Sequence, residues 1–268
     1  MPTTGFGLRG LFLLAILGAW FPAPGEADSP TRIHLAGDST MAAKQADKRP
    51  ETGWGEMLQP WFDGLKVIVC NHARNGRSTR TFIEEGRWTE LLGQLQPGDY
   101  VLIQFGHNDQ SIKKVGRYTP PGQYLSNLER FVSDVRKRNG KPVLLTPVVR
   151  RRFDEEGTFY DSHGRYPDLV RDAAQRTKAA LIDMEVSSRR LVRNVGAEGS
   201  KQLYLWLKPG EFENYPQGLE DNTHFSPFGA RLMAALVIDG IIDLDLELAG
   251  MVRQKPLQQE VGSVDIPR

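Results

Sequence analysis

Five short apolar runs at nearly even intervals constrain the fold of this chain more than any other feature. They occupy residues 33–36, 66–70, 100–105, 142–147 and 180–183, so successive runs begin 33 to 42 residues apart. That interval matches the length of a strand–helix–strand unit. Near-continuous apolar character is typical of strands that are buried on both faces, as in parallel sheets. The runs therefore predict five parallel strands connected by crossovers.

Helical patterns fill the intervals between the runs. Apolar residues recur at helical spacing in residues 52–62, 79–95, 122–138, 167–178 and 186–195. Ser226 as an N-cap and Pro227 in the first turn predict a further helix over residues 227–239. Strands that alternate with helices indicate a sheet covered on both faces. We expect an α/β fold, a three-layer α/β/α sandwich whose five-stranded parallel sheet has the flavodoxin-like order 2-1-3-4-5.

The first 27 residues have the layout of a secretory signal peptide. Arg9 precedes an apolar run over residues 11–21, and proline and small residues follow as far as Ala27. The run is shorter than the roughly 20 residues that span a bilayer, although an uncleaved N-terminal anchor is the alternative. We expect a signal peptide at 1–27, one domain at 28–248 and a polar tail at 249–268. A chain organised in this way is secreted or periplasmic and makes no membrane contact after signal cleavage.

Charge and cysteine content argue against a nucleic-acid-binding protein and against a protein stabilised by internal disulfides. The formal net charge of the chain is +1, which provides no broad positive field for binding nucleic acid. Cys70 is the only cysteine of the sequence, so no disulfide can form within the chain, and stability has to come from the core.

Three residues follow the first three apolar runs at the points where the predicted strands end. Ser39 follows the first run, Gly76 the second and Asn108 the third. In the order 2-1-3 the first strand lies between the other two, and sites of open α/β sheets form beyond the carboxyl ends of the strands. We therefore expect Ser39, Gly76 and Asn108 to converge on one small region.

These residue types suit the transfer of an acyl group. A carbonyl under attack develops an oxyanion, which the backbone N–H groups of Ser39 and Gly76 and the side-chain amide of Asn108 can stabilise. The Ser39 hydroxyl needs a base to become a nucleophile. Asp221 and His224 lie three residues apart immediately before a predicted helix. In a tight turn the carboxylate reaches Nδ1–H of the imidazole and leaves Nε2 facing the serine.

Each of these motifs also has an ordinary structural interpretation when it is taken alone. Gly-Asp-Ser and Asn-Gly are common turn sequences, and the segment before residue 227 can serve simply as a helix cap. A metal site built from His107, Asp109, Asp221 and His224 is a further possibility, but metal-ligand spacing such as H-E-x-x-H is missing from the sequence. We therefore predict no metal, and the joint placement of the motifs favours catalysis.

The motif residues resemble those of a known family, the SGNH (GDSL-like) hydrolases. The matching blocks are Gly37-Asp38-Ser39, Gly76, Gly106-His107-Asn108-Asp109 and Asp221-x-x-His224. The segments QFGHNDQ, VLLTPVVRRRFDEEG, DSHGRYPDLVR and DNTHFSPFGA are similar to the rhamnogalacturonan acetylesterase group within that superfamily. The resemblance extends from about residue 33 to residue 239.

This resemblance implies a complete mechanism. Ser39 is the expected nucleophile, His224 the general base and acid, and Asp221 the residue that orients the histidine. Ser39, Gly76 and Asn108 form the expected oxyanion hole. The implied reaction removes O-acetyl groups from a pectic polysaccharide, rhamnogalacturonan, through an acetyl-enzyme and without a cofactor. We assign Asp38 to shaping the turn around the nucleophile.

Four further residues are the main candidates for binding the substrate. Arg150 and Arg151 follow the fourth predicted strand and can hold galacturonate carboxylates in a two-pronged manner. The basic residues Lys113, Lys114 and Arg117 follow the third predicted strand and lie on the same expected rim of the site. Alternatively, Arg150 and Arg151 belong to a solvated charged loop that pairs with acidic residues 154–156. Tyr204 and Trp206 begin the long aromatic loop 203–220 and can line a sugar-binding groove, or can simply pack the loop onto the core.

Three alternative functions remain open from the sequence. The first is an acetylesterase of another acetylated polysaccharide, such as xylan. The second is a general esterase or lipase for small or fatty esters, although the sequence shows no long apolar lid segment near the site. The third is an inactive carbohydrate-binding protein on the same fold, against which the complete Ser39, Asp221 and His224 set argues.

Overall fold

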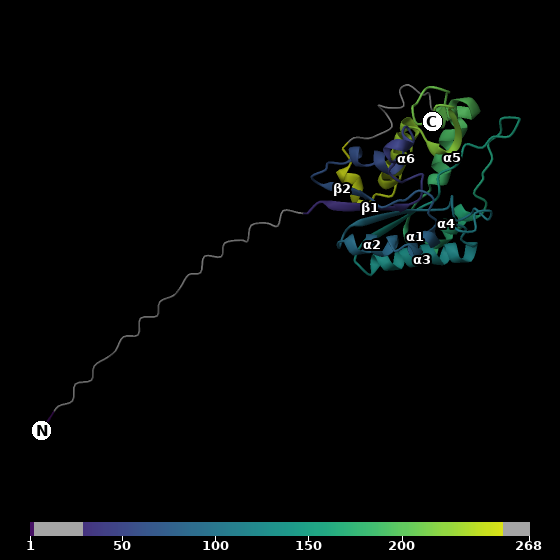
Figure 1. Cartoon of the computed structure of the whole chain (residues 1–268). Helices are drawn as coiled ribbons and strands as arrows, with labels where there is room; N and C mark the ends of the chain where they lie inside the picture. Colours follow the sequence, from purple (N-terminus) through teal and green to yellow (C-terminus); the bar gives the residue numbers. More distant parts are fainter. Residues whose placement is uncertain (3–28, 254–268) are drawn as a thin grey trace.

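The computed structural model describes residues 1–2 and 29–253 of the chain (Figure 1). The predicted signal peptide, apart from residues 1–2, and the part of the predicted tail beyond residue 253 lie outside the described residues. No helix among the described residues has both the length and the apolar character that a bilayer crossing requires.

Five parallel strands form the central sheet in the order β2-β1-β3-β4-β5. This order confirms the predicted fold, and β1 lies between β2 and β3, as the sequence predicts. All residues of β3 are buried, because helices cover both faces of the sheet. The strands are β1 Thr31–Gly37, β2 Val67–Asn71, β3 Tyr100–Gln104, β4 Lys141–Leu145 and β5 Ala180–Ile182.

Two layers of helices enclose the sheet, each with its own apolar cluster. In Figure 1 helices α1 to α4 lie on one side of the sheet, and α5 and α6 lie on the other. Phe82, Trp88 and Phe131 belong to the first cluster, and Val192 and Met233 belong to the second. The helices are α1 Thr79–Glu84, α2 Arg87–Gln94, α3 Pro121–Arg136, α4 Tyr166–Thr177, α5 Met184–Gly199 and α6 Pro227–Asp243.

Two of the predicted helices differ from the structure. The predicted helix over residues 52–62 consists of two short 3-10 helices, η2 Trp54–Met57 and η3 Gln59–Trp61. Pro60 has no N–H to donate to a preceding turn, so a continuous α-helix cannot pass through it. The predicted helix over residues 79–95 is divided into α1 and α2, because Gly86 adopts a left-handed conformation with φ of +74°.

The predicted loop over residues 203–220 also contains regular structure. Strand β6, Tyr204–Leu207, pairs with β7, Leu219–Phe225, in a two-stranded antiparallel sheet. The remaining short elements are 3-10 helices η1 Ala46–Lys48, η4 Ser200–Leu203 and η5 Glu247–Met251.

The described part of the domain extends beyond residue 248, where the sequence predicts the polar tail to begin. Val252 forms a bridge with Phe62. The backbone N–H of Arg253 donates to the carbonyl oxygen of Trp61 at 2.9 Å, and its guanidinium forms an ion pair with Asp63 at 3.3 Å. Residues 249–253 therefore pack onto the domain, because these contacts tie their backbone to the segment before β2.

Candidate active site

The Ser39 turn begins where β1 ends at Gly37. Asp38 is fully buried, and its Oδ1 accepts hydrogen bonds from the backbone N–H of Thr40 at 3.0 Å and from Thr40 Oγ1 at 2.9 Å. Burial opposes ionisation of this carboxyl, but neighbouring His107 and the hydrogen bonds from Thr40 lower the pKa of Asp38 to about 2. Asp38 therefore remains a carboxylate at neutral pH and shapes the turn that carries Ser39 past the end of the sheet.

Asp221 and His224 lie in a bulge of strand β7. Leu205 of β6 pairs with Asp221, whereas the adjacent Tyr204 pairs with Phe225, so residues 222–224 form an insertion within the ladder. Asp221 Oδ1 accepts hydrogen bonds from the backbone N–H groups of Thr223 at 2.6 Å and His224 at 3.0 Å. The expected tight turn is therefore present inside a strand, and the Asp221 carboxylate closes it.

The three predicted catalytic residues meet in one hydrogen-bonded line. His224 Nδ1 lies 2.7 Å from Asp221 Oδ2, and His224 Nε2 lies 2.9 Å from Ser39 Oγ, although 185 residues separate Ser39 from His224. Burial would raise the pKa of Asp221, but the hydrogen bonds and charge of His224 lower it overall. An ionised Asp221 favours the tautomer that carries a proton on Nδ1. That tautomer leaves Nε2 free to accept the Ser39 proton.

The turn that carries Gly76 runs beside the Ser39 turn. The backbone N–H of Arg74 donates to the carbonyl oxygen of Gly37 at 3.0 Å, which continues the β1–β2 pairing to the end of the sheet. Gly76 has a φ of +77°, a conformation that favours glycine. A Cβ at this position would lie 3.1 Å from the guanidinium carbon of Arg117. The backbone conformation therefore favours glycine at this position, and a side chain here would also press against the Arg117 guanidinium.

Asn108 is held against the same turn. Its Nδ2 donates to the carbonyl oxygen of Arg77 at 3.0 Å, and its Oδ1 accepts a hydrogen bond from Arg117 Nη1 at 3.3 Å. An amide nitrogen carries two N–H groups, so one remains for a developing oxyanion. The structure thus joins Asn108 to the segment that contains Gly76, as the predicted convergence requires.

Arg117 is an exposed cation at this edge of the site. It occupies the space directly beside Gly76 and contacts Asn108, both of which are predicted oxyanion-hole residues. The sequence places Arg117 among the basic residues after the third strand, on the expected rim of the site. The structure brings this residue over the Gly76 turn.

Two buried charged residues at the site carry no signal in the sequence. Lys44 Nζ donates to the carbonyl oxygen of Ser39 and to Asn75 Oδ1, the latter at 2.8 Å, and forms an ion pair with Glu51 Oε1 at 2.8 Å. The same Glu51 oxygen lies 3.9 Å from His224 Nε2. Both residues belong to a charged segment, residues 44–51, that reads as an ordinary surface loop.

Among the four predicted substrate-binding residues, Arg150 lies next to the site. It is half-buried, and its guanidinium donates to the carbonyl oxygen of His107 and to Ser162 Oγ, each at 3.2 Å. Arg150 therefore joins the loop that carries Asn108 to the loop after β4.

The prediction that Arg151 and Tyr204 face a substrate is wrong. Arg151 is buried, and its guanidinium donates to the carbonyl oxygen of Ala197 and to Asn222 Oδ1, so its N–H groups hold α5 against β7. Tyr204 is 1% exposed, and its hydroxyl donates to the carbonyl oxygen of Val149 at 2.6 Å. Both side chains are occupied in holding the fold, because buried polar groups need partners within the protein.

Trp206 is half-buried beside these residues, and its ring is already in contact with cations. The Arg151 guanidinium lies 4.7 Å from the ring centroid, and Lys201 Nζ lies 4.6 Å from it. The indole N–H donates to Asn222 Oδ1 at 3.0 Å, next to the bulge of β7. The structure therefore gives Trp206 a packing role, and sugar binding by this ring has no support in the contacts.

The described residues contain no group of three or more His, Cys, Asp or Glu side chains arranged to hold a metal ion. Asp109, which the sequence groups with possible ligands, is buried, and its Oδ1 accepts hydrogen bonds from Thr79. Burial raises its pKa to about 7. Asp109 thus ties α1 to the Asn108 loop.

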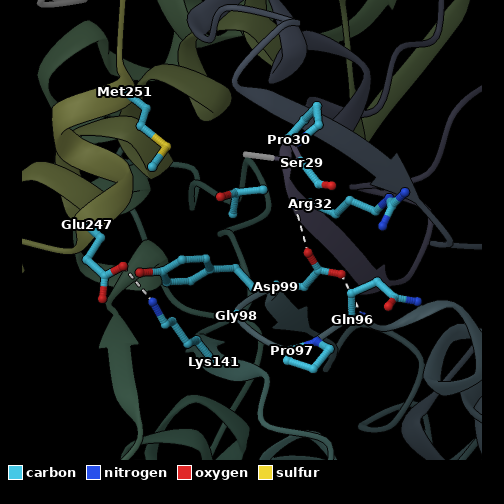
Figure 2. A pocket seen from close by; sticks show the side chains of 12 residues that line it. Ser29, Pro30, Arg32, Gln96, Pro97, Gly98, Asp99, Lys141, Glu247 and Met251 are labelled. Carbon is cyan, nitrogen blue, oxygen red and sulfur yellow. Dashed lines mark hydrogen bonds and ion pairs between the residues drawn. The ribbon is translucent and has the colours of Figure 1, made fainter. Parts of the chain in front are cut away.

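A cavity of about 570 Å³ lies at the opposite end of the sheet (Figure 2). Tyr100 and Lys141, which begin β3 and β4, line it together with Glu247 and Asp99. Lys141 Nζ forms an ion pair with Glu247 at 2.6 Å, and Asp99 accepts hydrogen bonds from two backbone N–H groups. Lys141 and Glu247 of this cavity are paired with each other, and the cavity is remote from Ser39, which follows the other end of β1.

The chain is similar in sequence to proteins of a known family. The sequence model of the GDSL-like Lipase/Acylhydrolase family matches residues 35–232. Rhamnogalacturonan acetylesterase RhgT from Bacillus subtilis (strain 168) is 41% identical over 219 residues, which cover 82% of this chain and 93% of that protein.

Two solved structures share the fold. YxiM from Bacillus subtilis has a TM-score of 0.69 at 24% identity, and the match covers 82% of this chain and 58% of that one. The acetylxylan esterase Axe2 from Geobacillus stearothermophilus has a TM-score of 0.58 at 19% identity, and the match covers 80% of this chain and 94% of that one.

Proposed function

Because the chain belongs to the GDSL-like lipase/acylhydrolase family and is a carboxylic ester hydrolase, we propose that it removes O-acetyl groups from rhamnogalacturonan. Family membership also confirms the resemblance inferred from the motif residues. One observation carries the proposal, namely the hydrogen-bonded line from Ser39 through His224 to Asp221 at the carboxyl end of β1. The similarity to a rhamnogalacturonan acetylesterase over most of the chain supports an acetylated carbohydrate, and specifically a pectic one, as the substrate.

In the proposed acylation, Ser39 Oγ attacks the carbonyl carbon of the acetyl ester. Its proton passes to His224 Nε2, and Asp221 stabilises the imidazolium that forms. The carbonyl oxygen becomes an oxyanion that accepts hydrogen bonds from the N–H groups of Ser39 and Gly76 and from the Asn108 amide. The tetrahedral intermediate then collapses, the bond to the sugar oxygen breaks, and that oxygen takes the proton from His224.

Deacylation repeats these steps with water. His224 Nε2 accepts a proton from a water molecule as its oxygen attacks the acetyl carbonyl of the acyl-enzyme. The intermediate releases Ser39 Oγ, which recovers the proton from His224, and acetate leaves the site. The imidazole thus returns to its neutral state after each turnover, and the proposed steps use no cofactor.

A cation beside the oxyanion hole supports an acidic substrate. Rhamnogalacturonan carries galacturonate carboxylates, and a guanidinium binds a carboxylate through two parallel hydrogen bonds. Arg117 is exposed and lies beside Gly76, so we assign it to a uronate carboxylate of the polymer. Its guanidinium hydrogen bond to Asn108 Oδ1, at 3.3 Å, is long and leaves most of its N–H donors for a ligand.

The test measures acetate release from acetylated rhamnogalacturonan, acetylated xylan and an aryl acetate, with the wild type and Ser39→Ala. We expect the wild type to favour rhamnogalacturonan and Ser39→Ala to be inactive on all three. Absence of release by the wild type from every ester would refute the proposal. A preference for xylan would replace the pectic substrate with a neutral one, and an active Ser39→Ala would refute the assigned nucleophile.

The role of Arg117 has its own experiment. Arg117→Ala should raise KM for acetylated rhamnogalacturonan about tenfold while leaving the aryl acetate, which has no carboxylate, nearly unchanged, since a charge-assisted pair contributes roughly 1.5 kcal/mol. The wild-type rate on the acidic polymer should also fall with added salt, which screens an exposed cation. Equal KM values for the two proteins on the polymer would remove Arg117 from the site.

Export of the chain is also part of the proposal. The basic start, short apolar run and small residues of residues 1–27 support a cleaved signal peptide. N-terminal sequencing of the protein recovered from the periplasm or the culture medium should find a start near residue 28. A protein that retains Met1 in the cytoplasm would contradict export.

A further inference from the structure

A buried ion pair, Lys44 with Glu51, lies against the nucleophile and the base of the site, since Lys44 contacts the Ser39 carbonyl oxygen and Glu51 lies near His224. None of the Lys44 side chain is exposed, and only 10% of the Glu51 side chain is exposed. Burying two charges costs more than an ordinary surface pair returns, so such a pair needs close partners on both sides. The partners found here are groups of the proposed reaction centre rather than remote parts of the core.

We propose that Lys44 and Glu51 are positioning residues for ester hydrolysis. Lys44 holds the Ser39 turn against the Asn75–Gly76 turn, and Glu51 places a second negative charge beside His224 Nε2. This inference rests on the proposed function, because it assigns both roles to the Ser39 and His224 mechanism.

Lys44 links the two turns that supply backbone donors to the oxyanion hole. Its ammonium group donates both to the carbonyl oxygen of Ser39 and to the side-chain oxygen of Asn75, the residue before Gly76. The N–H groups of Ser39 and Gly76 have to point at one oxygen atom, so the spacing between their turns governs oxyanion binding. A small displacement of either turn weakens catalysis strongly, because these donors act through fixed geometry.

Glu51 acts on the base. Its Oε1 lies 3.9 Å from His224 Nε2, on the side of the imidazole that receives the Ser39 proton. A carboxylate at this distance favours the protonated imidazole, as Asp221 does from the Nδ1 side. Among the described residues, His107 also interacts electrostatically with His224, and Lys44, which pairs with Glu51, offsets part of the Glu51 charge. Removing either charge of the pair therefore changes the electrostatic surroundings of His224.

The two halves of the pair should shift the pH dependence of the reaction in opposite directions. Glu51→Gln keeps the shape and removes the negative charge, so the acidic limb of kcat/KM for an aryl acetate should move to lower pH. Lys44→Met leaves Glu51 without its counter-charge, so the same limb should move to higher pH. Each shift should be about one pH unit, the low end of the effect of a charge within roughly 4–6 Å.

The size of the loss in kcat should also differ between the variants. Lys44→Met releases both backbone turns and should lower kcat at least about 100-fold, the effect of losing one oxyanion donor. Glu51→Gln should lower kcat less, because its amide oxygen can still accept from Lys44. The double variant should recover the wild-type pH limb but not the wild-type kcat.

An exposed lysine–glutamate pair at the far end of the sheet provides the control. Lys141→Met and Glu247→Gln break an ion pair of 2.6 Å that is remote from Ser39 and should leave kcat and the pH limb at wild-type values. Thermal unfolding of every variant separates loss of fold from loss of positioning. If Lys44→Met does not fold, Glu51→Gln alone still decides the matter through its predicted shift.

The outcomes of this experiment are distinguishable. A wild type that hydrolyses no acetyl ester would refute the proposed function, and the inference would fall with it. An active wild type whose pH limb is unchanged in Glu51→Gln, or moves in the same direction in both variants, would refute the inference alone.

Discussion

Replacing Asp221 with asparagine separates the two roles that the structure gives to this carboxylate. Oδ2 lies 2.7 Å from His224 Nδ1, whereas Oδ1 accepts the backbone N–H groups of Thr223 and His224 and closes the bulge of β7. The asparagine amide oxygen can still close the bulge. Its NH₂ group then faces Nδ1 and selects the tautomer with the proton on Nε2, which cannot accept a proton from Ser39.

The magnitude follows from this change of tautomer. We expect kcat for an aryl acetate to fall about 10³- to 10⁴-fold, which corresponds to a barrier higher by about 4 to 5.5 kcal/mol. Asp221→Asn should unfold at nearly the wild-type temperature. Asp221→Ala should lose a similar factor in kcat and should also be destabilised by about 1 to 2 kcal/mol, since two backbone N–H groups lose their acceptor at a partly exposed site.

A second aspartate–histidine pair serves as the matched control for this prediction. Asp161 Oδ1 lies 3.3 Å from His163 Nδ1, and Asp161 Oδ2 accepts the backbone N–H groups of His163 and Gly164. Asp161→Asn makes the same chemical change at a histidine that packs edge-on against His107 and has no hydrogen bond to Ser39, so kcat should stay within a few fold of the wild type. An Asp221→Asn enzyme that keeps more than a tenth of the wild-type kcat would refute the assigned tautomer control.

Three further predictions concern the backbone, the pH dependence of stability and a corrected residue. Gly76→Ala should destabilise the protein by about 1 to 2 kcal/mol in chemical denaturation and lower kcat, because φ is +77° there. Burial lowers the pKa of His72 from 6.5 to about 4, so the unfolded chain binds more protons between these values. The contribution of neutral, buried His72 to the free energy of unfolding should be fully present above about pH 6.5 and should decrease as the pH drops toward 4. His72→Gln should therefore reduce the pH dependence of the unfolding temperature. Tyr204→Phe leaves the buried carbonyl of Val149 without its donor, so unfolding should be easier by about 1 to 2 kcal/mol while KM stays unchanged.

Local patterns in the sequence were sufficient to predict the sheet and the catalytic line. Five apolar runs at regular spacing determine a parallel sheet, and the carboxyl ends of its strands determine where Ser39, Gly76 and Asn108 can meet. Asp221 and His224 were predictable as a pair because they are only three residues apart, so their contact depends on local backbone geometry rather than on distant packing.

Other features depended on partners that are distant in the sequence. The loop expected over residues 203–220 contains β6 because that strand pairs with β7, and no periodic pattern marks either strand. Arg151 appeared available for a carboxylate, yet the carbonyl oxygen of Ala197, 46 residues away, accepts its hydrogen bonds. A charged side chain has no intrinsic preference for solvent, substrate or a buried acceptor, and the surrounding fold decides among them.

The sequence by itself determined the order of the strands and the chemical groups that meet at their ends. Only the tertiary structure decided what surrounds those groups. Lys44 and Glu51 illustrate the difference, since the eight positions of the charged loop 44–51 do not reveal that both side chains are buried against Ser39 and His224. The positions of the strands follow from patterns that neighbouring residues share along the chain, and their alternation with helices indicates a fold class with a known strand order. The environment of a charge follows from which distant atoms the completed fold brings within a few ångströms of it.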